Sequence, residues 1–308
     1  LFNYVTSIDF PTEESPILFY SNNCRQDLKE IFCVSIQRAQ KSIYLSTYGL
    51  SDPQIVTLLQ NKLREGLSIT ISCHPREIYS IQKLLGTSVE IIPAQSNGLN
   101  HEKITILDGK LVFLGSTNLT ETSLSLHDNI LIGVLSPTLA RHLLERTPGG
   151  RCVLSIQHQN LSFYFLPEKD KFTLTHILSI IDRAQEEIQI ALFTFTHPEI
   201  QSALIHARMR GVKITVIMDQ FLARGCCKKT IDTLKQANCI TRTSNSYKLM
   251  HHKWARIDRT TFIVGSANWT KSAFVKNRDY ILIINSLDKT QNAFIDNLWI
   301  NLYRHSSL

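Results

Sequence analysis

Residues 101–118 read HEKITILDGKLVFLGSTN, and residues 251–268 read HHKWARIDRTTFIVGSAN. Both stretches follow the template His-x-Lys-x4-Asp-x6-Gly-Ser-x-Asn, and the residues between the Asp and the Gly are largely apolar in both. Histidines placed independently in a protein core would not reproduce such a frame. We therefore expect one site that is assembled from two similar halves of the chain.

The repeat extends well beyond these two motifs. Arg38-Ala39-Gln40 recurs as Arg183-Ala184-Gln185, and Gly66, before a strand-like run, recurs as Gly211, so both pairs lie 145 positions apart (183 − 38). At the motifs the offset is 150 (251 − 101), and we place the five or so extra residues of the second half between 220 and 227. Because a repeat fixes architecture, the two halves are expected to share one fold.

Each half is predicted to alternate strands with helices, from the spacing of its apolar residues. The first half is predicted to contain strands 17–20, 43–48, 67–72, 88–92, 103–107, 111–114 and 130–135, helices 26–41 and 76–85, a helix that opens near Asp52-Pro53, and a closing helix. The second half is predicted to contain strands 162–166, 188–195, 212–218, 239–243 and 280–285, helices 172–186 and 227–237, a helix that opens near His197-Pro198, and a closing helix. This order predicts an α/β fold, a pseudo-twofold tandem repeat of two mixed, mostly parallel sheets with helices on both faces. The expected units are residues 1–147 and 151–308, separated by the linker Thr147-Pro148-Gly149-Gly150.

Composition places the chain among globular proteins, since 43% of its 308 residues are hydrophobic and 19% are charged. The net charge of +7 favours an anionic partner, although a solvated basic surface would give the same value. Seven cysteines occur without C-x-x-C spacing, so a zinc site is not expected, and no apolar run reaches the length of a membrane span. The sequence begins at Leu1 rather than Met, which leaves open a leader or anchor ahead of it and, with it, export or membrane association.

The residue types of the template suit chemistry at a phosphate group. A buried His can attack as a nucleophile or exchange a proton near neutral pH, while Lys, Asn and Ser offer a positive charge and hydrogen-bond donors to phosphate oxygens. Two facing copies would place an imidazole on each side of one phosphorus, which is the geometry of in-line displacement. Because two lysines would already neutralise the phosphoryl charge, we expect neither a metal ion nor another cofactor.

The doubled template resembles the His-Lys-Asp signature of the phospholipase D superfamily, whose members include phospholipases D, cardiolipin synthases and bacterial endonucleases. The resemblance covers nearly the whole chain and implies the phospholipase D/nuclease fold. It implies that His101 is the nucleophile that forms a phosphohistidine and that His251 is the general acid that later activates water. It also implies a set of phosphate-binding residues, Lys103, Lys253, Asn118, Asn268, Ser116 and Ser266, in which the two serines either donate to the phosphate or shape its pocket.

Four aspartates and the two residues at the variable motif position have different expected roles. In the superfamily an acidic residue further along the chain orients each histidine, and the candidates here are Asp128 and Asp279, 27 and 28 residues after His101 and His251. The alternative for both is a helix cap or a surface charge. Two sets of residues are expected outside the chemistry: Asp108 and Asp258 as structural turn residues, and Glu102 and His252 as side-facing residues.

The identity of the phosphodiester stays open between two substrates. A phospholipase D, which would hydrolyse or transfer a lipid headgroup, needs an apolar approach, and the loop Asp219–Ala223 offers one beside Arg224 and Lys228. An endonuclease needs a basic groove with aromatic side chains, and the charge of +7 agrees with it. A third alternative, a phosphate-binding module without catalysis, disagrees with the intact His and Lys of both copies. We expect a phospholipid substrate, peripheral membrane contact, and a monomer that is internally a pseudo-dimer.

Overall fold

The computed structural model describes residues 8–147 and 149–308, so Pro148 of the predicted linker lies outside the described residues. The strands of the first half are β1 (Ile17–Ser21), β2 (Ser42–Ser46), β3 (Ser68–Cys73), β4 (Glu90–Pro93), β5 (Ile104–Leu107), β6 (Leu111–Gly115), β7 (His127–Asp128) and β8 (Ile130–Leu135). Its helices are α1 (Leu28–Arg38), α2 (Pro53–Arg64), α3 (Ile78–Leu85), α4 (Glu121–Leu126) and α5 (Pro137–Glu145), with short 3-10 turns η1 (Asn22–Cys24) and η2 (Pro75–Glu77).

The second half repeats this order after one added strand. Its strands are β9 (Arg151–Ile156), β10 (Gln159–Leu166), β11 (Glu187–Leu192), β12 (Lys213–Met218), β13 (Ile240–Ser244), β14 (Leu249–Met250), β15 (Lys253–Ile257), β16 (Thr261–Gly265), β17 (Asp279–Asn285) and β18 (Ser306–Ser307). Its helices are α6 (Phe172–Arg183), α7 (Pro198–Met209), α8 (Gln220–Arg224), α9 (Lys228–Gln236), α10 (Lys271–Val275) and α11 (Lys289–Arg304). Helix α8 lies in the segment where the five extra residues were predicted, so that prediction is confirmed.

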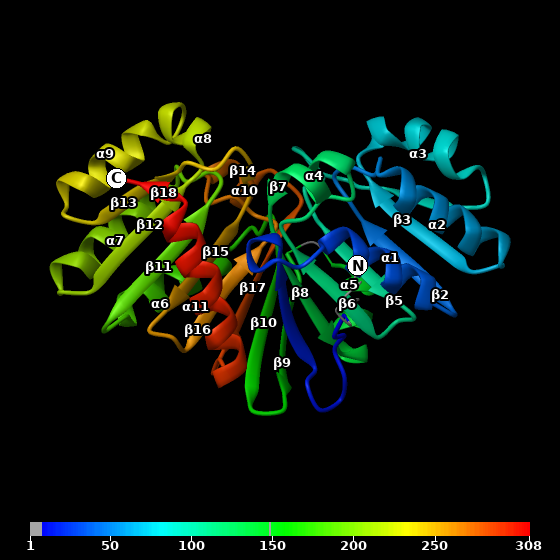
Figure 1. Ribbon diagram of the computed structural model, residues 1–308, viewed down its shortest axis with the longest axis horizontal. Helices are drawn as coiled ribbons and strands as arrows, with labels where there is room; N and C mark the ends of the chain where they lie inside the picture. Colours follow the sequence, from blue (N-terminus) through cyan, green and yellow to red (C-terminus); the bar gives the residue numbers. More distant parts are fainter. Residues whose placement is uncertain (1–7, 148) are drawn as a thin grey trace, which may run out of the picture.

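Two mixed sheets lie side by side and carry most of their helices on the outer flanks (Figure 1). Their strand orders are β1-β8-β6-β5-β2-β3-β4 and β18-β13-β12-β11-β15-β16-β17-β10-β9. The prediction of mostly parallel sheets is wrong, because among the described residues of these two sheets parallel pairing is confined to β2-β3-β4 and β11-β12-β13. The physical reason is the motif itself: β5 and β6 join through a tight turn at Asp108-Gly109, with φ of 54° and 65°, and such a hairpin makes its strands antiparallel.

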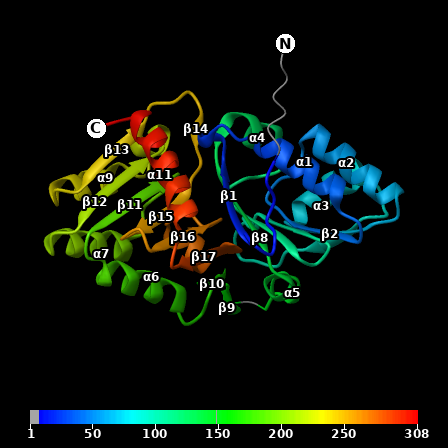
Figure 2. The ribbon, with the colours of Figure 1, turned by 60° about the horizontal axis from the view of Figure 1, so that its bottom comes forward.

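The inner faces of the two sheets share one core. Phe19 of β1 stacks on Phe262 of β16 with ring centroids 5.3 Å apart, and the same apolar cluster takes in residues of α5 from the first half and of α11 from the second. Helix α11 lies against β1 across the seam (Figures 1 and 2). The two halves are therefore held together by a buried interface rather than by a linker alone. No helix in the described part of the chain is both long and apolar enough to traverse a bilayer.

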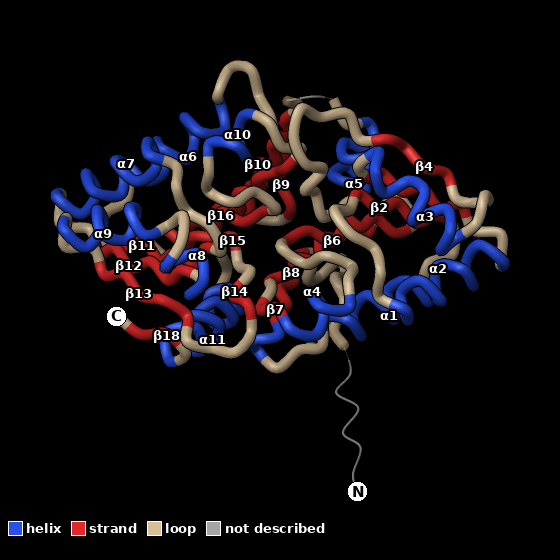
Figure 3. The backbone as a smooth tube through the Cα atoms, turned by 90° about the horizontal axis from the view of Figure 1, so that it is seen from above, coloured by secondary structure: helices blue, strands red, loops and turns tan. Residues whose placement is uncertain are grey.

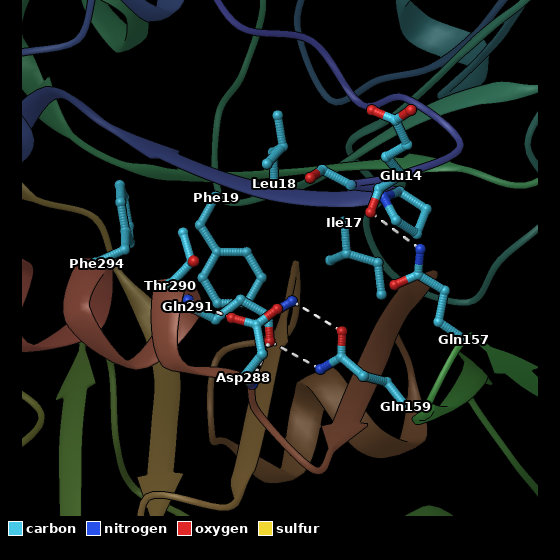
Figure 4. A pocket seen from close by; sticks show the side chains of 12 residues that line it. Glu14, Ile17, Leu18, Phe19, Gln157, Gln159, Asp288, Thr290, Gln291 and Phe294 are labelled. Atoms are coloured by element: carbon cyan, nitrogen blue, oxygen red, sulfur yellow. Dashed lines mark hydrogen bonds between the residues drawn. The ribbon is translucent and has the colours of Figure 1, made fainter.

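A cavity of about 130 Å³ opens at the seam near the start of β1 (Figure 4). The glutamine side chains of its lining are already paired: Gln159 Nε2 donates to Gln291 Oε1 over 2.8 Å, and Gln157 Nε2 donates to the carbonyl oxygen of Glu14 over 3.0 Å. None of the motif residues lines this cavity. We therefore interpret it as a packing feature of the interface between the halves.

Candidate active site

Each motif histidine is docked by its backbone onto the opposite half. The His101 N–H donates to the carbonyl oxygen of Arg278 over 2.8 Å, and the Arg278 N–H donates to that of Leu99 over 2.8 Å. In the second copy, β14 pairs with β7, and the His251 N–H donates to the carbonyl oxygen of Asp128 over 2.9 Å. Figure 3 shows β7 and β14 side by side between the two sheets. The two motifs are thus brought together by the pseudo-twofold arrangement.

The imidazole rings are also held from the opposite half, but by different groups. His101 Nδ1 lies 2.8 Å from Asp279 Oδ1, as an orienting carboxylate requires. His251 Nδ1 lies 3.1 Å from Asn129 Oδ1. The prediction that Asp128 orients a motif histidine is therefore wrong: its side chain lies beside Asn23 and lines a separate polar cavity. Asp128 contributes its backbone carbonyl to His251, not its carboxylate.

The error in Asp128 is a shift of one residue, and the sequence held the signal that corrects it. Asp279 lies 150 positions after Asn129 (279 − 129), which is the offset of the two motifs, whereas its offset from Asp128 is 151 (279 − 128). Asn129 is neutral, so the expectation of an acidic residue does not select it. The strict repeat makes Asn129 the counterpart of Asp279.

Ser116 and Ser266 support these two orienting groups. Ser116 Oγ donates to Asn129 Oδ1 over 2.8 Å, and Ser266 Oγ donates to Asp279 Oδ1 over 2.7 Å. Both serines are fully buried. The predicted contact of their hydroxyls with a phosphate is contradicted by this arrangement, since each hydroxyl is already used inside the protein.

The two motif lysines are buried beside the histidines. Lys103 Nζ donates to the His101 carbonyl over 2.7 Å, and Lys253 Nζ donates to the His251 carbonyl over 3.0 Å. Burial lowers the pKa of Lys103 to about 7 and holds the pKa of Lys253 well below its ordinary value. A buried anion placed between the two ammonium groups would reverse this effect.

Burial also depresses the pKa of both histidines, but a neighbouring carboxylate opposes this shift only at His101. Desolvation and then the Lys103 ammonium lower the pKa of His101, while Asp279 acts in the opposite direction. Desolvation, then Lys253, then Lys103 hold the pKa of His251 well below its ordinary value. The neutral form of both rings therefore predominates near pH 7.

Two aromatic side chains that sequence reasoning missed flank the histidines. The Tyr48 ring lies 5.6 Å from the His101 ring, and the Phe193 ring lies 5.0 Å from the His251 ring, between centroids. Lys103 Nζ and Lys253 Nζ lie over the same two rings at 5.6 and 5.2 Å. Tyr48 and Phe193 are 145 positions apart (193 − 48), so the repeat offset, applied to aromatic residues, could have found them.

The motif asparagines and aspartates have different surroundings. Asn118 Oδ1 and Asn268 Oδ1 are buried and have no hydrogen-bond partner among the described residues, and a rotated amide could present Nδ2 to a phosphate oxygen. Asp108 accepts from the backbone N–H groups of residues 40–42, and Asp258 accepts from those of residues 185–187. These aspartates fasten the motif hairpin to the preceding loop, as their predicted structural role requires.

Glu102 and His252 are not side-facing, so that prediction is wrong. Glu102 is fully buried and accepts from Arg146 Nε over 2.9 Å and from Arg278 Nε over 3.0 Å. His252 Nε2 lies 2.8 Å from Asn23 Oδ1, in the other half. The variable position of each motif thus joins the two halves.

A metal site does not emerge from the described residues, since no three His, Cys, Asp or Glu side chains gather as ligands would. Metal independence of the chemistry stays a prediction.

Comparisons with known proteins agree with this architecture. The family described as "Cardiolipin synthase, PLD-like domain" matches residues 32–147 and 177–299. The mitochondrial cardiolipin hydrolase of Xenopus tropicalis is 33% identical over 137 residues, 44% of this chain and 64% of that protein. The phospholipase D of Rickettsia felis is 30% identical over 125 residues, 41% of this chain and 61% of that protein. The chain therefore matches less than two thirds of the length of either relative.

A solved structure extends the likeness to the whole fold. Phosphatidylserine synthase from Haemophilus influenzae Rd KW20 superposes with a TM-score of 0.77 over 97% of this chain and 88% of that chain, at 12% identity. At that identity the likeness concerns the fold alone. Since the family match covers both halves and each half carries the His-Lys-Asp motif, the chain belongs to the phospholipase D superfamily.

Proposed function

We propose that the protein is a metal-independent phosphodiesterase that acts through a phosphohistidine, with a phospholipid as its substrate. One observation carries the proposal. Two His-Lys pairs, buried except for the partly exposed His101, come from different halves, and each histidine is held through Nδ1 by a residue of the other half. This leaves Nε2 of both rings available for the chemistry.

In the first step, His101 Nε2 attacks phosphorus and the bond to the leaving oxygen breaks. The leaving oxygen takes the Nε2 proton of His251, which reacts in its imidazolium form, so the alcohol departs neutral. In the second step, a water oxygen attacks phosphorus and gives its proton to His251 Nε2. The P–N bond breaks, and its electron pair returns to His101 Nε2. If an alcohol replaces water, the same step transfers the phosphatidyl group.

The charges of the site suit a phosphodiester. Lys103 and Lys253 supply two positive charges when protonated, and Asp279 supplies one negative charge. A surplus of one positive charge matches the single negative charge of a phosphodiester. We assign phosphate binding to the two lysines, with the amides of Asn118 and Asn268 as further donors.

Support for a lipid comes from two directions. The cardiolipin hydrolase and the phospholipase D described above carry names of enzymes that act on phospholipids. Asp219 begins the loop that was predicted as an apolar approach. Its Oδ1 accepts from the N–H of Phe221 and so caps α8. Its Oδ2 accepts from the N–H of Met250, beside His251, and so connects α8 to the motif. The side chain of Phe221 is 62% exposed. An exposed aromatic ring anchored next to the site suits peripheral contact with a membrane surface.

The test is a comparison of substrates in EDTA. The protein is incubated with labelled cardiolipin or phosphatidylcholine vesicles, and separately with labelled single-stranded DNA and RNA. Turnover of the lipids is expected. Cleavage of nucleic acid without lipid turnover would support the alternative endonuclease, and binding without turnover of any substrate would support a phosphate-binding module.

The roles of the histidines are tested by trapping the intermediate. His101→Ala should abolish both phosphoenzyme and turnover. With a substrate whose leaving group needs no protonation, His251→Ala should accumulate phosphate on His101, acid-labile and base-stable, because loss of the general base slows hydrolysis by about 10²–10⁴. Mass spectrometry locates the phosphate. Phosphate on His251 in the His101→Ala variant, with none on His101 in the converse variant, would reverse the assignment.

A further inference from the structure

The pseudo-twofold symmetry of the site is broken at one side chain. Asn129 and Asp279 each accept from the motif serine of their own half and each contact the histidine of the other half. The next backbone N–H in each copy, that of Ile130 or Tyr280, donates to the same serine. Asn129 is therefore the structural counterpart of Asp279, with an amide in place of the carboxylate.

The surrounding contacts decide which way the Asn129 amide points. Asn129 Nδ2 donates to the carbonyl oxygen of Ser123 over 2.9 Å and lies 3.4 Å from that of His127. Its Oδ1 consequently faces Ser116 and His251, since a flipped amide would oppose oxygen to oxygen. Because Oδ1 accepts a hydrogen bond, Nδ1 of neutral His251 carries the proton and donates to it, and the lone pair lies on Nε2.

The other groups around His251 do not replace the missing carboxylate. Lys253, Lys103 and, when protonated, His101 bring positive charge, and the rings of His127 and Phe193 pack at 5.5 and 5.0 Å. From the segment before α8, Asp219 uses its Oδ2 on the backbone of Met250 and is not a hydrogen-bond partner of the ring. Asp128, on β7, directs its side chain to the neighbouring polar cavity.

Resting on the proposed function, we propose that Asn129 is a positioning residue that makes the two histidines chemically unequal. It orients His251 as a neutral acceptor of protons without stabilising its imidazolium form, whereas Asp279 stabilises the positive charge that develops on His101 when the P–N bond forms. His251 is thereby a scarce acid for the first step and a ready base for the second. Asn129 also preserves the surplus positive charge that receives the phosphodiester.

The sign of the pH effect follows from this assignment. Departure of an alkoxide needs protonated His251, so turnover of an alkyl phosphodiester is present below the pKa of His251 and falls as pH rises through it. Asn129→Asp places a carboxylate at this position and raises that pKa, typically by about 1–3 units. The alkaline limb of the pH–rate profile should move upward by a similar amount, while KM rises because the site has lost its surplus charge.

The experiment compares three variants on two substrates. The variants are Asn129→Asp, the matched charge change Asp279→Asn, and Asp182→Asn as the control at an exposed carboxylate of α6. The substrates are a phosphatidylcholine, with an alkyl leaving group, and bis(p-nitrophenyl) phosphate, whose leaving group needs no proton. In Asn129→Asp, the alkaline limb of the pH–rate profile should shift upward for the lipid and stay at the same pH for the aryl ester. Asp279→Asn should lower kcat on both substrates, and Asp182→Asn should leave both profiles unchanged.

A separate readout keeps this inference independent of the proposed activity. The pKa of His251 is measured by NMR titration of ¹³C,¹⁵N-histidine-labelled protein, before and after Asn129→Asp. A rise of at least one unit supports the role of Asn129 even if neither substrate is turned over, in which case the proposed function alone fails. An unchanged pKa of His251, or equal shifts of the profile on both substrates, would overturn the inference.

Discussion

Replacing the buried carboxylate of Glu102 by an amide should weaken the seam between the halves. Glu102 accepts from Arg146 of the first half, from Arg278 of the second, and from Ser46 Oγ over 2.7 Å. Glu102→Gln keeps the size of the side chain but removes its charge and part of its acceptor capacity. Two partly buried guanidinium groups would then lose their common counter-ion.

The size of the effect follows from these contacts. Hydrogen bonds to a charged group contribute about 1.5–3 kcal/mol each, and the desolvation of a buried carboxylate offsets part of their sum. Removal of one partner from a buried ion pair costs about 3–5 kcal/mol, so we expect the free energy of unfolding to fall by about 3 kcal/mol or more. Arg278 also precedes Asp279 and docks His101 through its backbone. A shift there should lower kcat on the order of 10–100-fold.

The assay is urea unfolding followed by far-UV circular dichroism, together with phosphodiesterase kinetics. Glu90→Gln is the matched control, because Glu90 lies exposed on β4 and accepts only from Thr70 Oγ1 over 2.7 Å among the described residues. The control should change the free energy of unfolding by less than about 0.5 kcal/mol. An equally small change for Glu102→Gln, with kcat preserved, would refute the role given to this buried ion-pair cluster.

Three further predictions follow from the same geometry. Activity should survive EDTA, because charge neutralisation falls to Lys103 and Lys253; loss that returns on adding Mg²⁺ or Zn²⁺ would contradict the mechanism. Residues 1–147 and 151–308, produced separately, should each be inactive, because each supplies one histidine and exposes half of the shared core; turnover by either fragment would contradict this. Binding of an unreactive phosphate analogue such as tungstate should take up protons and weaken as pH rises through about 7, where Lys103 loses its charge. Calorimetry in two buffers of different ionisation enthalpy measures the proton uptake. Binding without proton uptake would show that the lysines are already charged.

The sequence repeat itself predicted most of the architecture. Its constant offsets predicted two similar halves, the position of the inserted helix α8, and the pairing of His101 and Lys103 with His251 and Lys253. Strand and helix positions followed from local apolar periodicity, because burial of one face imposes that period on the sequence. The direction of strand pairing did not follow, since a hairpin and a crossover leave similar apolar patterns.

The partners of each histidine were decided by tertiary structure. The sequence alone determined that two His-Lys pairs exist and which chemistry they suit, since residue type and spacing are local properties. It could not determine that Asp279 serves His101 and that Asn129 serves His251, because these contacts cross from one half to the other over 178 and 122 positions. Burial likewise belongs to the folded chain: only when the two sheets close on one another do Lys103 and Lys253 lose water, and the loss of water lowers their pKa values.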